Sequence, residues 1–206
     1  RNVAATGTGS LPDAGRKVFA CAFGRECMIQ GTIIEQPSIH SERLLLRPLR
    51  RSDEGLLALY ASDERVAANT RSIPHPLPPG AAEAVITRAL SPQRREDVWA
   101  MDGKAAGLGE LLGVISLERL SPERSEIRYW VAPAFWNTGF ASEAVHALLD
   151  ANPQGVKTVF AEVFQSNPVS ARVLTNAGFD YIGDAEAFSV AQNRTVPTWT
   201  YLRKMA

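Results

Sequence analysis

Cysteine is scarce in this chain. Among its 206 residues only Cys21 and Cys27 are cysteines, and their spacing fits no metal-binding motif; a reduced protein of the cytoplasm is expected. Long hydrophobic runs are also missing, because no stretch approaches the roughly 20 apolar residues of a membrane-spanning helix. An excess of one charge is absent as well, since 22 basic residues balance 22 acidic ones. Neither nucleic acid nor membrane is therefore expected as a partner, and any anion must be bound by a local site.

The remaining composition is that of an ordinary globular domain, with 45% hydrophobic and 21% charged residues. We expect residues 1–37 to form an N-terminal extension that is partly flexible, because its start is rich in glycine, alanine and threonine. Residues 38–206 are expected to form the folded domain. Within the extension, VFACAF and CMIQGTIIE each favour a short strand.

The apolar pattern after residue 41 predicts an α+β fold with a mixed sheet. Alternating or apolar runs predict strands within 42–49, 96–102, 105–120, 125–132, 157–164, 179–185 and 197–205. Apolar residues at helical spacing predict helices within 51–62, 80–90, 141–152 and 167–179. The first of these helices is expected to begin at an N-cap of Ser52 or Asp53. The second is expected to bury Ala82, Val85, Ile86, Ala89 and Leu90.

The stretch FWNTGFASEA, residues 135–144, places a glycine-containing turn directly before a helix. Gly139 has no Cβ, so the backbone around it can approach a ligand closely. The first amides of the helix have no intrahelical acceptor, and the helix dipole is positive there. This combination is suited to binding a phosphate or a pyrophosphate.

Longer motifs around this turn resemble those of the GNAT family of acetyl-CoA-dependent N-acetyltransferases. The motifs are EIRYWVAPAFWNTGFASEA and the later NPVSARVLTNAGF. ERLLLRPL and SIPHPLPPGAAEA are similar to segments of the RimJ/RimL-like branch, the ribosomal-protein-alanine acetyltransferases. The resemblance extends from about Ser38 to Met205. It implies a mostly antiparallel central sheet with a splayed parallel strand pair, flanked by helices.

The resemblance also implies a cofactor site for acetyl-CoA, used as co-substrate, and no metal. The residues implied in cofactor binding are Val131, Trp136, Asn137, Thr138, Gly139, Phe140, Ala141, Ser142 and Asn167. The backbone of 136–142 would bind the pyrophosphate, and the main chain of Val131 would bind pantetheine and the acetyl carbonyl. Arg128 and Asn137 stand where the family has glycines. Asn137 tolerates a left-handed backbone, so the turn is expected to persist.

Glu126, on the strand that would line the cleft, is the first candidate for the general base, and Glu143 and Glu162 are alternatives. For the leaving thiolate, many family members use a tyrosine where this chain has Leu174. In the RimJ/RimL-like branch a serine near the motif asparagine is the usual proposal, so the resemblance implies Ser170 as the acid, with Tyr129 as an alternative donor. His75, Arg128 and Tyr129 are the residues expected to bind the acceptor.

The expected function is direct transfer of an acetyl group from acetyl-CoA to a primary amine in a ternary complex. The acceptor is either a protein N-terminal α-amine or a small amine, and a homodimer is compatible with the sequence. A non-catalytic acyl-CoA-binding module is the alternative from another functional class, because the tyrosine and two glycines are replaced. A toxin-like or antibiotic-modifying acetyltransferase is a third hypothesis, with the same chemistry on a different amine.

Overall fold

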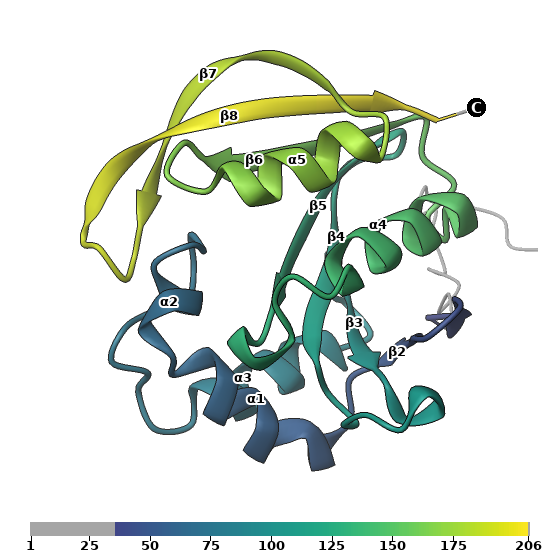
Figure 1. Ribbon diagram of the computed structural model, residues 1–206, viewed down its shortest axis with the longest axis vertical. Helices are drawn as coiled ribbons and strands as arrows, with labels where there is room; N and C mark the ends of the chain where they lie inside the picture. Colours follow the sequence, from purple (N-terminus) through teal and green to yellow (C-terminus); the bar gives the residue numbers. More distant parts are fainter. Residues whose placement is uncertain (1–35, 206) are drawn as a thin grey trace, which may run out of the picture. The chain divides into compact units, whose positions relative to one another are not determined.

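The computed structural model describes residues 36–205 and contains helices and strands in nearly all of the predicted places (Figure 1). The helices are α1 (Glu54–Ala61), α2 (Glu64–Ala67), α3 (Ala81–Ala89), α4 (Phe140–Ala151) and α5 (Pro168–Asn176). The strands are β1 (Ile39–His40), β2 (Leu45–Pro48), β3 (Glu96–Asp102), β4 (Gly113–Ser121), β5 (Arg124–Val131), β6 (Thr158–Phe164), β7 (Asp180–Ser189) and β8 (Arg194–Lys204). The strands predicted in the extension, and both cysteines, lie outside the described residues.

The described strands form one eight-stranded sheet in the order β1-β2-β3-β4-β5-β6-β8-β7. Across residues 36–205 all neighbouring strands are antiparallel except β5 and β6, which are parallel. The helix α4 connects this parallel pair, as a crossover connection requires. The predicted α+β class with one parallel pair in a mostly antiparallel sheet is therefore confirmed.

Alternating residues of the central strands enter two separate hydrophobic cores. Trp99, Met101 and Ile115 pack with α4 and α5 on one face of the sheet. Val98 and Val114 pack with α1 and α3 on the other face. The two pairs of helices lie on opposite sides of the sheet in Figure 1. This period of two is the one expected for strands buried on both faces.

The face that carries Val98 and Val114 becomes charged farther along the same strands. Glu96 lies two residues before Val98 in β3 and pairs with Glu118, four residues after Val114 in β4. Arg128 of β5 pairs with Ser116, the residue between Val114 and Glu118 on this face. The side chains of Glu96, Glu118 and Arg128 are half-buried or exposed, whereas Val98 and Val114 are buried beneath α1 and α3. Only part of this face is therefore covered by helices, and the remainder is available for a site.

Three local expectations need correction. Asp53 is the N-cap residue of α1, as expected, but its side chain makes no capping bond, because the carboxylate accepts hydrogen bonds from the Arg50 amide and from Arg47. Leu90 is 43% exposed, because α3 ends at Ala89 and the chain turns away from the core. The short elements β1 and α2 were not expected, since each has too few residues to show a periodic pattern.

A buried cluster of charges joins β2 and β3 to the start of α1. The Arg47 guanidinium donates to both oxygens of Asp53 at 2.8 and 2.9 Å and to Asp102 at 2.7 Å. All three residues are buried. Burial alone would raise the pKa of Asp53, but the hydrogen bonds from Arg47 and from the Arg50 amide outweigh it and lower the pKa.

We expect Asp53→Asn to destabilise the protein by about 3 kcal/mol at pH 7, because it leaves Arg47 buried with an incomplete set of partners. A carboxylate whose folded pKa is lowered stabilises the fold above its unfolded pKa of about 3.9, and that contribution is lost as the pH falls through the folded value. The difference in unfolding free energy between wild type and variant should therefore shrink from pH 7 to pH 3.

Urea denaturation at both pH values measures this difference. Asp63→Asn is the control, because Asp63 also pairs with an arginine and has a lowered pKa, but lies at the surface. It should cause a much smaller loss. A constant gap between wild type and Asp53→Asn across the pH range would contradict the assignment.

Candidate active site

The parallel strands β5 and β6 separate at one end. Their pairing ends at Ile127 and Ala161, although β5 continues to Val131 and β6 to Phe164. Beyond this point β6 stays paired with β8, and β5 stays paired with β4. Main-chain groups on the facing edges therefore lose their strand partners and become available to a ligand. The splay predicted for this pair is confirmed.

Val131 directs its main chain into the gap between β5 and β6. The amide of Ala132 donates to the carbonyl of Leu112 at 2.8 Å. Because bonded and non-bonded pairs alternate along antiparallel strands, the adjoining pair, Val131 and Gly113, is a non-bonded one. The Val131 carbonyl accepts a hydrogen bond from Trp136 Nε1 at 2.7 Å. The amide of Val131 is then left facing the gap between β5 and β6.

The turn before α4 has the backbone that an anion site needs. Asn137 and Gly139 have left-handed φ angles of 61° and 86°, so asparagine does replace the family glycine without loss of the turn. The first intrahelical bond runs from the Glu143 amide to the Gly139 carbonyl. The amides of residues 140–142 therefore have no acceptor within the helix, and this arrangement fits a phosphate.

A second segment, just before β2, supports this turn. Glu143 accepts hydrogen bonds from the Ser41 hydroxyl at 2.7 Å, the Arg43 amide at 2.6 Å and Arg43 Nε at 2.8 Å. Arg43 also donates to the Thr138 carbonyl at 3.1 Å. Burial alone would raise the pKa of Glu143, but these hydrogen bonds outweigh it and lower the pKa. Glu143 therefore anchors the turn and is not placed as a base.

The start of α5 lies beside Tyr129. Asn167 caps the helix, since its side-chain oxygen accepts from the Ser170 amide at 3.2 Å, and its amide nitrogen is left for another partner. The Tyr129 hydroxyl donates to the Ser170 carbonyl at 3.0 Å, and burial raises the pKa of Tyr129. Ser170 is among the residues that line the cavity described below. Leu174 is fully buried in the core.

Arg71 bridges the two splayed strands through their carboxylates. Its guanidinium donates to Glu126 of β5 at 2.5 Å and also to Glu162 of β6. Thr198 of β8 donates to the second oxygen of Glu162 at 2.6 Å. The side chains of Glu126 and Glu162 are only 12% and 16% exposed. Two of the three carboxylates considered as a base therefore lie together.

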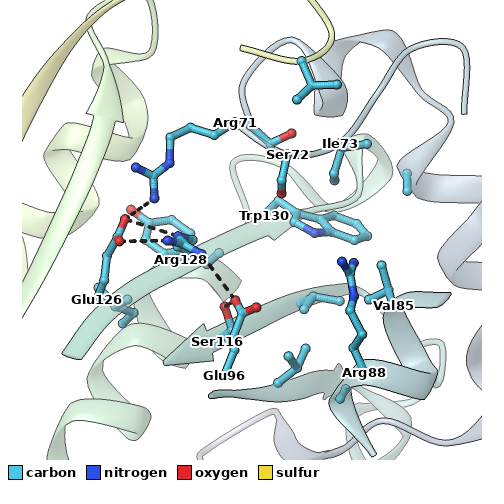
Figure 2. Close-up of a pocket in the computed structure, with 18 of the residues that line it drawn as sticks. Arg71, Ser72, Ile73, Val85, Arg88, Glu96, Ser116, Glu126, Arg128 and Trp130 are labelled. Carbon is cyan, nitrogen blue, oxygen red and sulfur yellow. Dashed lines mark hydrogen bonds and ion pairs between the residues drawn. The ribbon is translucent and has the colours of Figure 1, made fainter. Parts of the chain in front are cut away.

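Arg128 is surrounded by three glutamates on the charged part of the sheet. It contacts Glu126 at 2.8 Å, Glu96 at 3.8 Å and also Glu118. Burial alone would lower the pKa of Arg128, but these carboxylates outweigh it and raise the pKa. Figure 2 shows Arg71 and Arg128 approaching Glu126 from two sides. Arg128 therefore holds Glu126 in place as well as lining the cavity.

A cavity of about 1010 Å³ contains most of these groups. It is lined by the acid–base candidates Glu126, Glu162, Tyr129 and Ser170, together with Asn167, Arg71 and Arg128. Apolar residues from the segment after α2 and from α3 form its other end, beside Trp130 (Figure 2). His75 is exposed and is not among the lining residues, whereas its neighbour Pro74 is.

Sequence reasoning missed several residues of this site. Arg71, Ser41, Arg43 and Thr198 act through partners 36 to 102 residues away in the chain, and no local motif marks them. Within residues 36–205 no group of three or more metal-ligating side chains was found. No helix in that range has the length and apolar character to span a membrane.

Comparison with known proteins assigns the family. The acetyltransferase (GNAT) domain family matches residues 43–180, more than half of the chain. The Bacillus subtilis (strain 168) protein called uncharacterized N-acetyltransferase YoaA is 29% identical over 157 residues, which cover 71% of this chain and 85% of that protein.

Solved structures share the fold. Mycobacterium smegmatis RimJ in complex with CoA-disulfide aligns with a TM-score of 0.71 and 17% identity, over 83% of this chain and 88% of that one. Vibrio cholerae spermidine N-acetyltransferase in complex with CoA and spermine aligns with a TM-score of 0.68 and 16% identity, over 79% and 96%. With its splayed strands and the turn before α4, this chain belongs to the GNAT family of acetyltransferases.

Proposed function

We propose that the protein transfers an acetyl group from acetyl-CoA to a primary amine, directly and within a ternary complex. The observation that carries this proposal is that one cavity contains the candidate base and the candidate acid and adjoins the gap between β5 and β6. An amine bound there would meet a thioester held in the gap, and such proximity supplies much of the rate of a two-substrate reaction.

The cofactor would be held mainly by backbone groups. The turn at Trp136, Asn137, Thr138 and Gly139, with the amides of 140–142 (Phe140, Ala141 and Ser142), would bind the pyrophosphate. The Val131 amide would donate to the acetyl carbonyl and stabilise the charge that develops on its oxygen. The free amide nitrogen of Asn167 would contact the pantetheine arm. Acetyl-CoA supplies an activated thioester, and this chain positions it.

Glu126 would accept the proton that the amine loses, directly or through a water molecule. A carboxylate has about four lone-pair positions, and three are occupied here by Arg71 and Arg128. The remaining position is on Oε2, which accepts a single bond from Arg128. Glu162 is the alternative base: each of its oxygens accepts one hydrogen bond, from Arg71 and from Thr198, so it also keeps unfilled positions.

Ser170 would donate a proton to the departing thiolate. It lies in the first turn of α5, next to the Asn167 cap, and is one of the residues that line the cavity. Tyr129 is the alternative donor, because its raised pKa keeps the phenol protonated. Its hydroxyl already donates to the Ser170 carbonyl, so it would first have to break that bond.

The acceptor is either a protein N-terminal α-amine or a small amine. Two proteins that share the fold are named for these two kinds of acceptor: RimL is called a ribosomal L7/L12 alpha-N-protein acetyltransferase, and the Vibrio cholerae enzyme a spermidine N-acetyltransferase. We place the chain in the RimJ/RimL-like branch on its sequence motifs, with a cytoplasmic location, a domain of residues 38–206 and a homodimeric assembly as further parts of the proposal.

Gly139→Ala should weaken coenzyme A binding by at least about 10-fold. A Cβ at this left-handed position is strained by about 1–2 kcal/mol and lies within the proposed phosphate cradle. Gly80→Ala is a matched control, because Gly80 also precedes a helix, has φ 76°, and has no atom within 4 Å of a built Cβ. Calorimetry with coenzyme A should separate the two variants, and equal affinities would argue against the cradle.

Glu126→Gln should lower kcat by about 10²–10⁴-fold at neutral pH, with recovery at high pH, where the amine loses its proton without help. Release of the free thiol from acetyl-CoA, measured against pH, gives the profile. Glu118→Gln is the control, since it also removes a carboxylate from Arg128 but lies outside the proposed mechanism. If Glu162→Gln alone showed the loss that high pH restores, the base would be Glu162.

Ser170→Ala should lower kcat about 100-fold with little change in the KM for acetyl-CoA, because a general acid acts in the transition state. Ser170→Thr keeps a hydroxyl and should restore much of the rate. Tyr129→Phe decides between the two donors. A full rate in Ser170→Ala together with a large loss in Tyr129→Phe would transfer the role to Tyr129.

A further inference from the structure

Arg88 lines the acceptor cavity without a protein partner. It projects from the last turn of α3 and is exposed, and its guanidinium makes no hydrogen bond or ion pair in the part of the chain that the structure describes. Figure 2 shows its guanidinium directed into the cavity, towards the indole of Trp130. A cation with unused donors is therefore available to a ligand in this cavity.

The carboxylates of the cavity, in contrast, are already neutralised. Among the described residues that line it, Glu126 and Glu162 are held by Arg71, and Glu96 accepts from Ser116 at 2.6 Å and contacts Arg128. A ligand with a second positive charge would find no carboxylate without a cationic partner. It would also meet Arg88, and like charges at close range repel.

The position of Arg88 also indicates how far its ligand lies from the reacting amine. Trp130 adjoins Val131, whose amide faces the gap where the proposed function places the acetyl group. Glu126 lies four residues back along β5, or about 13 Å at the rise of a strand. An anion bound by Arg88 therefore lies at the other end of the cavity from Glu126, and the acceptor must extend from Arg88 towards that carboxylate for its amine to lose a proton there.

We infer that the acceptor is a small amine that also carries an anionic group, a carboxylate or a phosphate, and that Arg88 binds this group. The inference rests on the proposed function, whose acceptor it specifies. A guanidinium binds either a carboxylate or a phosphate through paired, charge-assisted hydrogen bonds. Trp130, Val85 and Ile73 form an apolar wall beside Arg88 that fits the carbon skeleton between amine and anion.

Matched pairs of acceptors test the inference. Each pair differs in one charge: α-amino acids against their amides, dipeptides against their C-terminal amides, and aminoalkyl phosphates against the parent amino alcohols. The first two series test a carboxylate and the third a phosphate, and 1,4-diaminobutane represents a doubly cationic acceptor. The ratio of kcat/KM within each pair is compared for wild type, Arg88→Gln and the control Arg51→Gln, an exposed arginine outside the cavity.

We expect wild type to prefer the anionic member of at least one series by about 10- to 100-fold, the range of a charge-assisted hydrogen bond. Arg88→Gln should abolish that preference by slowing only the anionic members, and Arg51→Gln should leave it unchanged. A preference for neutral acceptors or for the diamine, or a preference that Arg88→Gln does not alter, would overturn the inference and leave the proposed function standing.

Failure of the proposed function has a different outcome. If no amine is acetylated, calorimetric titration of the same compounds into the protein with coenzyme A decides the inference. Binding of anionic amines that is lost in Arg88→Gln would support it without catalysis. Absence of binding, or binding that Arg88→Gln leaves unchanged, would refute it.

Discussion

The separation of β5 from β6 beyond Ile127 and Ala161 is the constraint on which the rest of the site depends. Each strand keeps its other neighbour, so the sheet divides into two halves and loses no antiparallel pairing. Arg71 spans the two halves at the end of the paired part, through Glu126, one residue before the last pair, and Glu162, one residue after it. The gap is therefore open at the main chain but bridged by side chains.

The segment after α2, which forms part of the cavity wall, is hydrogen-bonded to the turn between β7 and β8. The carbonyl of Arg71 accepts from the Val190 amide at 3.0 Å, and Gln192 donates to the Ala68 carbonyl at 3.0 Å. These bonds attach the segment after α2 to the turn between β7 and β8. The hairpin of β7 and β8 therefore holds the main chain of Arg71 through Val190, and it holds the carboxylate of Glu162 through the Thr198 hydroxyl. The position of the carboxylates is set by packing as much as by their own strands.

Sequence patterns were sufficient where the cause of a structure is local. The cap by Asn167, the left-handed Asn137 and Gly139, and the alternation of β5 each follow from residues within one turn or one strand. The partners of Arg43 and Arg71 could not be predicted in this way, because they depend on which strands become neighbours. The hydrogen bond from Trp136 to Val131 spans only five residues, yet it depends on a rotamer that sequence does not specify.

Three glutamates were equivalent candidates for the base by residue type, and their surroundings now give them different roles. Glu143 receives three hydrogen bonds from the segment before β2, which lower its pKa and make it an anchor for the turn. Glu162 has a donor on each oxygen. Glu126 faces the cavity with one lone-pair position unfilled. A base needs both access to its substrate and a free acceptor position. Glu126 and Glu162 line the cavity and each keep an unfilled position, whereas Glu143 is not among the residues that line it.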